Sequence, residues 1–282
     1  MTIIENKTYG GERPLYASHD LEINNVTILE GESGLKECSN IVCRNSRFEG
    51  NYVLWRIFGL QMFNCTIAEP SRATLWYTYD IEMNDCTIDG PKSFRETERA
   101  VLNRCEFTNA LETFWSCRDT KLVDCNIKGG DYLFLRSENI EIENMNLQGK
   151  YVFQYVKNVV IRNAVIDTKD AFWEAENVTV YDSKVTSEFL AWHSRNVKFV
   201  RCHISGGQPL CYAEGLVLED CTFDPESDLA FEYSDVKATI KGGIKSIKNP
   251  RTGFITADSA EEVIIDENLI KGSDCKITIN NH

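Results

Sequence analysis

The sequence has few of the features that mark membrane-spanning, exported or multi-domain chains. No apolar run approaches the roughly 18 residues of a membrane span. The opening residues, MTIIENKTYGGERPLY, do not combine a basic start with a long apolar segment. Only six prolines occur, and no Gly/Ser-rich or low-complexity block interrupts the chain. We therefore expect a cytoplasmic protein without membrane contact, folded as one domain over residues 1–282.

Positive charge is also scarce. Lys and Arg total 30 against 43 Asp and Glu, which gives a formal net charge of −13 and a pI of about 4.9. Proteins bind nucleic acids largely through cationic side chains that neutralise phosphates, so this balance argues against a nucleic-acid partner. It also disfavours a polyanionic ligand such as pectin, unless a local basic patch overrides the mean.

Metal and cofactor motifs are missing as well. The 11 cysteines include no Cys-x-x-Cys pair, so no zinc site is predicted. No phosphate-binding glycine loop or dinucleotide-binding pattern occurs. We expect neither a metal nor a cofactor, and in a cytosolic chain the thiols would stay reduced.

What the chain does contain is an internal repeat. Each copy carries apolar side chains at a first position and two, five and seven residues later, as at Ile81, Met83, Cys86 and Ile88. The five-later position, here called the cysteine column, recurs every 19 to 21 residues at Val26, Ser46, Cys65, Cys86, Cys105, Cys125, Met145, Ala164, Ser183, Cys202 and Cys221. A further copy, VIIDENLI, would place Asn268 in this column.

A repeat of this length predicts an all-β, right-handed parallel β-helix of about 12–13 coils. Two alternating strand fragments joined by a bend explain the apolar offsets. One coil cannot bury its own apolar face, so the coils must stack. Residues 1–18 would form an N-terminal cap segment, and residues 235–282 less regular coils.

Two recurring residue types fit this arrangement. The cysteines in the column are small, so we expect them to be buried free thiols rather than disulfides or metal ligands. Asparagine precedes the first strand of four successive coils, at Asn139, Asn158, Asn177 and Asn196. Asparagine tolerates turn conformations, and stacked amides can hydrogen-bond from coil to coil.

Several short motifs carry a family resemblance. They are Y-x-G-E-R-P-L-Y at 9–16, G-E-S-x-L-K at 31–36, R-A-x-L-W-Y at 72–77, D-A-F-W at 170–173 and D-L-A-F-E-Y-S at 228–234. Together they resemble an uncharacterised bacterial family, the domain of unknown function numbered 3737. The resemblance covers essentially the whole chain. It implies a right-handed β-helix of the pectate-lyase-like type and brings no assigned catalytic residues.

Three neighbouring columns follow the repeat in each coil. The first is apolar: Leu54, Leu75, Phe94, Phe114, Phe134, Phe153, Phe172, Ala191, Leu210 and Ala230. The second holds all five tryptophans: Trp55, Trp76, Arg95, Trp115, Leu135, Gln154, Trp173, Trp192, Cys211 and Phe231. The third is polar or amphipathic: Arg56, Tyr77, Glu96, Ser116, Arg136, Tyr155, Glu174, His193, Tyr212 and Glu232.

A regular strand cannot bury the first column and expose the second and third together. Either the chain bends between the second and third columns, or the tryptophans face inward and the first column faces out. Arg95 and Gln154 in the tryptophan column favour outward tryptophans. In both cases the third column lies at the surface beside aromatic rings.

This surface is the candidate ligand site. Indole rings can stack on sugars while charged and hydroxyl groups fix the sugar hydroxyls. We expect an oligosaccharide to bind at Arg136, Tyr155, Trp173, Trp192 and Tyr212. Equally, stacked Trp and Tyr side chains can simply stabilise the coils.

Catalysis has weaker support, and the sequence leaves open whether the protein is an enzyme. The candidate catalytic pair is Glu174 and His193, one coil apart, which could transfer a proton in a glycoside hydrolase or polysaccharide lyase-like reaction. A glycosidase needs two carboxylates about 5–9.5 Å apart. The glutamates of the third column are separated by three or more coils, or about 14 Å and more, so the column contains no such pair.

A second outward column alternates acids and bases: Asp85, Arg104 and Asp124, then Asp182, Arg201 and Asp220. Aspartates alone would suggest Ca²⁺. The interleaved arginines favour a ladder of salt bridges instead.

Two functions are compatible with these features. The first is a carbohydrate-binding or carbohydrate-processing β-helix. The second is a non-catalytic cytosolic scaffold, with the tryptophans as a protein interface. Self-association into a homo-oligomer is compatible with either.

Overall fold

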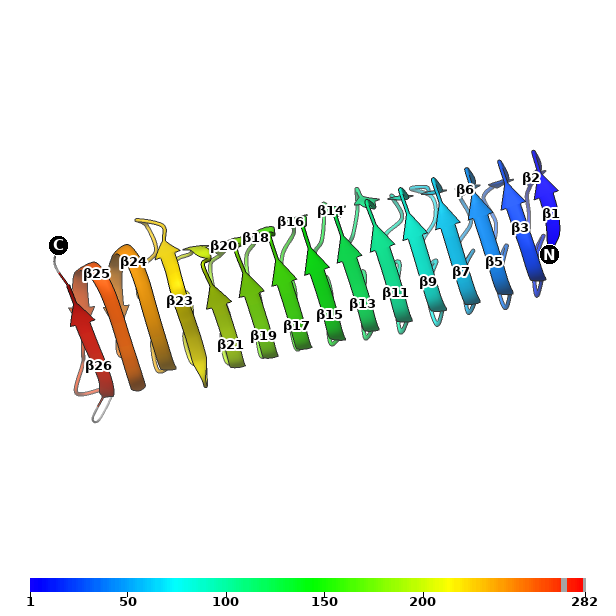
Figure 1. The fold of residues 1–282 in the computed structure, drawn as a ribbon. Helices are drawn as coiled ribbons and strands as arrows, with labels where there is room; N and C mark the ends of the chain where they lie inside the picture. Colours follow the sequence, from blue (N-terminus) through cyan, green and yellow to red (C-terminus); the bar gives the residue numbers. More distant parts are fainter. Residues whose placement is uncertain (270–272, 281–282) are drawn as a thin grey trace. The chain divides into compact units, whose positions relative to one another are not determined.

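The computed structural model describes residues 1–269 and 273–280. The chain forms an all-β parallel solenoid of about 14 turns with about 19 residues per turn, which confirms the predicted fold class (Figure 1). No helix occurs in this part of the chain, and accordingly no helix long and apolar enough to cross a membrane is found there. The contacts divide the chain into two compact units, Met1–Gln148 and Gly149–His282.

The first unit consists of eight coils with a long-strand face and a short-strand face. The long strands are β1 (Thr2–Glu5), β3 (His19–Asn24), β5 (Ser39–Arg44), β7 (Phe58–Phe63), β9 (Tyr79–Asn84), β11 (Glu98–Asn103), β13 (Arg118–Val123) and β15 (Glu138–Glu143). The short strands are β2 (Thr8–Tyr9), β4 (Thr27–Ile28), β6 (Arg47–Phe48), β8 (Thr66–Ile67), β10 (Thr87–Ile88), β12 (Glu106–Phe107), β14 (Asn126–Ile127) and β16 (Asn146–Gln148). Segment 1–18 thus contributes β1 and β2, which pair in parallel with β3 and β4.

The second unit repeats this plan and then changes. Its long strands begin with β17 (Lys157–Arg162), β19 (Glu176–Tyr181) and β21 (Arg195–Val200), and its short strands are β18 (Val165–Thr168), β20 (Lys184–Ser187) and β22 (His203–Ser205). β23 (Leu216–Phe223), β24 (Asp235–Lys248) and β25 (Thr252–Ile264) are longer, and β26 (Asp274–Ile279) follows. Register shifts interrupt the pairing of β24 with both β23 and β25. Asn268 lies exposed in a turn after β25, so its predicted place in the cysteine column is wrong.

Left-handed backbone conformations turn the chain directly after each long strand from β1 to β21. Asn64, Asp85 and Arg104 have φ of 51°, 56° and 50° there. Asn and Asp tolerate this region better than most residues. A second left-handed position lies inside the long strands, where Asn177 donates to Asn158 and Asn196 donates to Asn177, each at 3.1 Å. The predicted asparagine ladder is therefore present.

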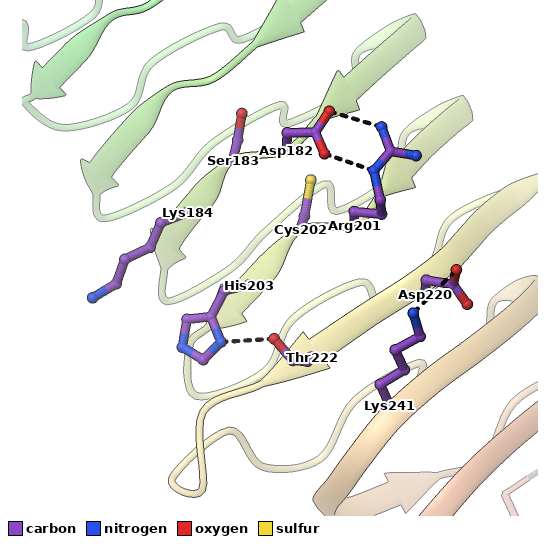
Figure 2. A pocket seen from close by; sticks show the side chains of 9 residues that line it. All are labelled: Asp182, Ser183, Lys184, Arg201, Cys202, His203, Asp220, Thr222 and Lys241. Carbon is purple, nitrogen blue, oxygen red and sulfur yellow. Dashed lines mark hydrogen bonds and ion pairs between the residues drawn. The ribbon is translucent and has the colours of Figure 1, made fainter.

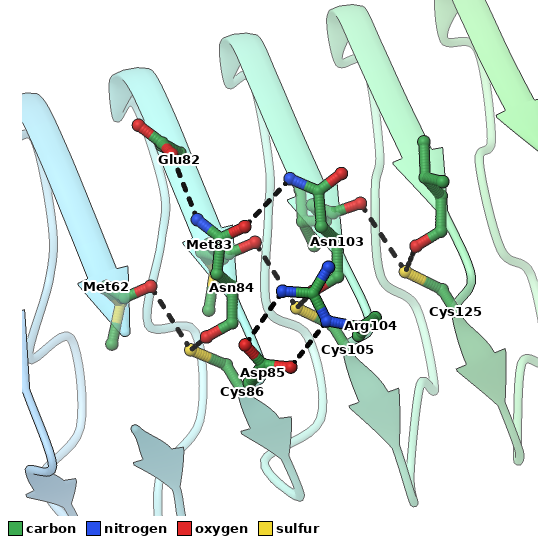
Figure 3. Close-up of polar contacts among 12 residues, drawn as sticks. Met62, Glu82, Met83, Asn84, Asp85, Cys86, Asn103, Arg104, Cys105 and Cys125 are labelled. Carbon is green, nitrogen blue, oxygen red and sulfur yellow. Dashed lines mark hydrogen bonds and ion pairs between the residues drawn. The ribbon is translucent and has the colours of Figure 1, made fainter. Parts of the chain in front are cut away.

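The cysteine column is buried next to this turn, as predicted. All six of its cysteines are free thiols, at most 2% exposed. The Cys86 thiol donates to the Asn84 carbonyl two residues earlier at 3.4 Å (Figure 3). Ser46 donates in the same way to the Arg44 carbonyl at 2.6 Å. The column thus favours residues that are small and can donate a hydrogen bond to the turn carbonyl, a role that packing alone did not suggest.

The segment between each short strand and the next long strand forms a third face of the coil, and it contains the three columns. The phenylalanines of the first column are fully buried, with Phe94 and Phe114 stacked at 4.4 Å and Phe153 and Phe172 at 5.1 Å. The tryptophans are half-buried and point outward, and most third-column residues are exposed. Both outer columns can face out because first-column and third-column residues such as Phe172 and Glu174 have φ of 60° and 49°. Strict strand alternation does not apply to such a backbone.

One register assignment in these columns needs correction. Phe231, rather than Ala230, occupies the first column, because its N–H bonds the Pro209 carbonyl as the Leu210 N–H bonds Leu190. Glu232 consequently lies in the second column, 8% exposed and paired with Lys248 at 2.9 Å. Tyr233 takes the third-column place. The interval from Leu210 to Phe231 contains the loop after β23, which accommodates the extra residues.

Candidate functional site

The second unit carries a continuous group of outward aromatic side chains, here called the aromatic surface: Trp173, Phe189, Trp192, His193, Tyr212 and Tyr233. Trp173 and Trp192 stack with ring centroids 5.6 Å apart and planes inclined by 27°. Phe189 meets Trp192 edge-on at 4.9 Å. The second column therefore carries stacked rings on two successive coils, flanked by Phe189.

The second column joins the third through His193 and Tyr212. His193 lies 5.4 Å from the Trp173 ring, and Tyr212 lies 5.1 Å from the Trp192 ring. Tyr212 continues to Tyr233 at 5.5 Å. The four central rings, Trp173, Trp192, His193 and Tyr212, thus each contact rings of their own column and of the neighbouring column, so this part of the surface is fixed along two directions.

Backbone hydrogen bonds hold the third column in place. Tyr155, Glu174, His193 and Tyr212 all have φ between 49° and 58°. The Glu174 N–H donates to the Trp192 carbonyl of the next coil at 2.9 Å, and the Tyr155 N–H donates to the Trp173 carbonyl at the same distance. Their side chains consequently project at the spacing of the coils, about 4.8 Å.

The exposure of the rings decides what a ligand could touch. Trp173, Trp192 and Tyr212 are half-buried, whereas Glu174 and His193 are exposed. Much of each indole face is covered by the next ring, so a ligand would meet ring edges and polar tips more than open faces. The Trp192 indole N–H donates to the Gln208 carbonyl at 2.7 Å. The indole N–H of Trp173 has no such bond within the described residues and is available to an acceptor.

The structure brings most of the predicted site residues together. Tyr155, Trp173, Glu174, Trp192, His193 and Tyr212 belong to the third face of the second unit, whereas Arg136 belongs to the first unit. Glu174 and His193 occupy successive coils, and no hydrogen bond or ion pair joins them in the part of the chain that is described. The predicted pair is thus adjacent in the column without forming a coupled acid and base.

Sequence reasoning missed three members of this region: Phe189, Tyr233 and Asp170. Phe189 precedes Trp192 by three residues, as Tyr52 precedes Trp55, and the latter two rings meet at 5.2 Å. This shared spacing could have identified Phe189. Tyr233 was hidden by the register error in its coil.

In the first unit the tryptophan side chains contact other side chains and backbone groups of the protein. The Arg95 guanidinium lies 4.2 Å from the Trp76 ring and 4.5 Å from the Trp115 ring. The indole N–H groups of both tryptophans donate to backbone carbonyls at 2.6 Å. These rings have internal partners on faces and edges, so the structural role foreseen for the tryptophans applies here.

The acid–base column forms part of the predicted ladder of salt bridges, since each arginine pairs with the aspartate of the preceding coil and Asp124 accepts a hydrogen bond from Asn144 instead. Arg104 binds Asp85 at 2.7 Å and Arg201 binds Asp182 at 2.6 Å, and each bond lowers the pKa of its aspartate (Figures 2 and 3). Asp220 pairs instead with Lys241 at 3.3 Å. No group of three or more His, Cys, Asp or Glu side chains suited to a metal ion occurs among the described residues.

A shallow depression of about 480 Å³ lies over this column in the second unit. Its lining includes Lys184, His203 and Thr222, and the His203 Nδ1 and Thr222 hydroxyl are 2.9 Å apart. In Figure 2, Lys184 and His203 project away from the Asp182–Arg201 pair. Because its charged groups diverge, the depression is a weaker candidate than the aromatic surface.

Comparison with known families gives one match that covers nearly the whole chain. Residues 2–278 match the model of a family described as protein of unknown function, DUF3737. The chain belongs to this family. A search of curated proteins finds no match.

Three solved structures show how distant the structural relatives are. A mannuronic acid-specific polysaccharide family 6 lyase from human gut microbiota aligns over 89% of this chain and 67% of its own, with 13% identity and a TM-score of 0.33. The mannuronan C-5 epimerase AlgE4 A-module of Azotobacter vinelandii covers 98% and 87%, with 10% identity and a TM-score of 0.26. The pentapeptide repeat protein HetL of the cyanobacterium Nostoc covers 80% and 92%, with 12% identity and a TM-score of 0.22. Similarity this low assigns no activity, so the function has to be argued from the residues of this chain.

Proposed function

We propose that this DUF3737 protein binds carbohydrate through the aromatic surface of its second unit. The observation that carries the proposal is the combination of half-exposed rings with exposed polar tips. Glu174, His193 and Tyr212 follow one another in the third column, beside Trp173 and Trp192 in the second column. Apolar surface with a few convergent polar groups is the usual composition of a carbohydrate or small-ligand site.

The length of the site supports an oligosaccharide rather than a single sugar. The third-column positions from Tyr155 to Tyr233 span four coil steps, roughly 19 Å. That length would suit three or four sugar units. The coils hold these side chains on a regular scaffold, which favours a preorganised binding surface.

The proposal is limited to ligand binding and does not include catalysis. Glu232 lies in the second column rather than the third, and it pairs with Lys248 at 2.9 Å. Glu174 is then the only third-column carboxylate from Tyr155 to Tyr233, so no pair of the kind used by glycosidases is formed in this stretch. Glu174 and His193 are proposed as ligand contacts, and proton transfer by them would require a second group supplied elsewhere.

A protein interface is the second candidate, in a cytoplasmic scaffold. The observation that favours it is the coverage of indole faces by neighbouring rings, which leaves less open ring area for sugars. Half-exposed Trp and Tyr side chains are also enriched where protein partners dock.

An oligosaccharide array probed with the intact protein tests the two candidates. We expect binding of at least one oligosaccharide class, and loss of that binding in the double variant Glu174→Ala/His193→Ala. The matched control is Glu96→Ala/Ser116→Ala, which alters the same column on successive coils of the first unit and should bind normally. An array without any bound glycan, or equal binding by both double variants, would contradict a carbohydrate site here.

A further inference from the structure

Asp170 is a buried carboxyl group beside the aromatic surface. The residue is 8% exposed, and its Oδ1 atom has no hydrogen-bond partner among the described residues. Burial raises the pKa of this carboxyl, Lys169 opposes the shift, and Glu188 adds to it. An unpaired buried carboxylate costs free energy, so the folded protein is less stable for carrying it.

The position of Asp170 in its coil links it to Trp173. It precedes Trp173 by three residues, as Tyr52 precedes Trp55 and Phe189 precedes Trp192. In those two coils the earlier ring contacts the tryptophan edge-on at 5.2 and 4.9 Å. Asp170 therefore occupies the place of a flanking aromatic ring and sets a carboxyl group there instead.

Other buried or partly buried aspartates of the second unit are stabilised by the fold. Asp235 receives two bonds from Arg251, and Asp228 is bonded by Ser246 and Lys245. Both have a lowered pKa, because these partners stabilise the charged form. No described residue bonds the Asp170 carboxyl group in this way, so a structural role does not account for it.

The side chains around Asp170 carry a net negative charge, which favours a cationic ligand, although Lys169, the charge that acts most strongly on Asp170, opposes one. Glu174 and Glu188 form no ion pair with any described residue, and the whole chain has a formal charge of −13. Lys169 is the nearby cation, and it too forms no ion pair with a described residue. The parts of the Trp and Tyr ring faces that stay uncovered add to this preference, since a cation over a ring face is attracted by its electrons, whereas the ring edge is not attractive to a cation.

We propose that Asp170 and the aromatic surface bind a protonated amine, carried by an amino sugar in an oligosaccharide. This inference rests on the proposed carbohydrate function and specifies the ligand class. The ammonium group would pair with the Asp170 carboxylate and replace its missing hydrogen-bond partner. The sugar hydroxyls would reach the free Trp173 indole N–H and the tips of Glu174 and His193.

Calorimetric titration with chito-oligosaccharides separates this inference from the parent proposal. The wild-type protein should bind the fully deacetylated, cationic oligomer at least about tenfold more tightly than the N-acetylated oligomer of the same length, as a charge-assisted hydrogen bond requires. Asp170→Asn should lose most of that preference. Asp167→Asn removes the same charge from an exposed site three residues away and should keep the preference within about twofold.

The melting temperature of the unliganded variants gives the second measurement. Asp170→Asn should melt about 2 °C or more above the wild type at neutral pH, because it removes a carboxylate that the fold does not compensate. A lower melting temperature would show that Asp170 is structural and overturn the inference. Equal binding of both oligomers, or binding of the acetylated one alone, would overturn it while leaving the carbohydrate proposal intact. If the protein binds other glycans but neither of these oligomers, the amino-sugar inference is overturned and the carbohydrate proposal stands. If the protein binds no glycan at all, both the inference and the carbohydrate proposal are overturned.

Discussion

The imidazole of His193 stacks on the phenol ring of Tyr212, with ring centroids 4.9 Å apart and planes inclined by 19°. The two residues lie 19 positions apart and have φ of 55° and 58°. Because the same left-handed conformation recurs in each coil, side chains of successive coils are superposed. The aromatic surface is therefore a product of the backbone repeat, and its side chains need little rearrangement to meet a ligand.

The cysteine column should resist chemical modification. We expect Cys65, Cys86, Cys105, Cys125, Cys202 and Cys221 to remain unlabelled by a thiol reagent in the native protein, because they are buried. Cys275 is half-buried and should react first, although burial raises its pKa to about 11. Mass spectrometry before and after denaturation checks this order. Rapid native labelling of the column would disprove the packing.

The alternation of strand β19 predicts unequal effects of neighbouring substitutions. Val180 is fully buried and Thr179 is half-exposed on the other side of the strand. Val180→Ala should lower the free energy of unfolding by about 1.5–3 kcal/mol, since it leaves a cavity. Thr179→Ala should change it by less than about 0.5 kcal/mol. Denaturant titration of both variants provides the measurement, and equal losses would contradict the register.

The exposed salt bridges should contribute little to stability. Arg104→Ala removes both bonds to Asp85, but the two side chains are each 55% exposed and compete with water and salt. We expect the melting temperature to fall by no more than about 2 °C at neutral pH. The pair lowers the pKa of Asp85, so any contribution is present above the ordinary aspartate pKa and is lost as the pH falls through the lowered value. A large loss at neutral pH would show that this column is more than a surface ladder.

Asp170 predicts the opposite pH dependence. Its folded-state pKa is raised by burial, so the wild type is penalised as the pH rises from the ordinary aspartate value through the raised value. Asp170→Asn removes this penalty. The stability advantage of the variant should therefore be absent at acid pH and grow as the pH rises towards neutrality. Thermal unfolding over that pH range tests the sign, and an advantage that shrinks with rising pH would refute the assignment.

The β-solenoid could be predicted from the sequence because burial repeats with the coil. The positions equivalent to Ile81 and Cys86 face the core in coil after coil, so the apolar pattern of the sequence predicts the fold. The third face could not be resolved in this way. Phe172 and Glu174 adopt left-handed conformations, which Phe and Glu rarely adopt, so their residue types do not reveal the turns of this face.

The candidate site was predictable only in outline. The tryptophan and polar columns identified the face, and their outward orientation was the favoured alternative. The burial of Asp170 could not be predicted, because the sequence does not distinguish an exposed aspartate in a loop from a buried aspartate without a partner. Tyr233 was not assigned to the third column, because the interval between Leu210 and Phe231 is longer than the repeat predicts.

The recurrence of the same turns in each coil also restricts how the chain can change in length. Removing one residue from a long strand would exchange core and solvent positions for the rest of that strand. Removing the whole interval from Cys105 to Cys125 would instead rejoin equivalent turns and keep inward side chains inward. Gene duplication and deletion could therefore lengthen or shorten this protein in steps of one coil, and the number of aromatic rungs available to a ligand would change with it.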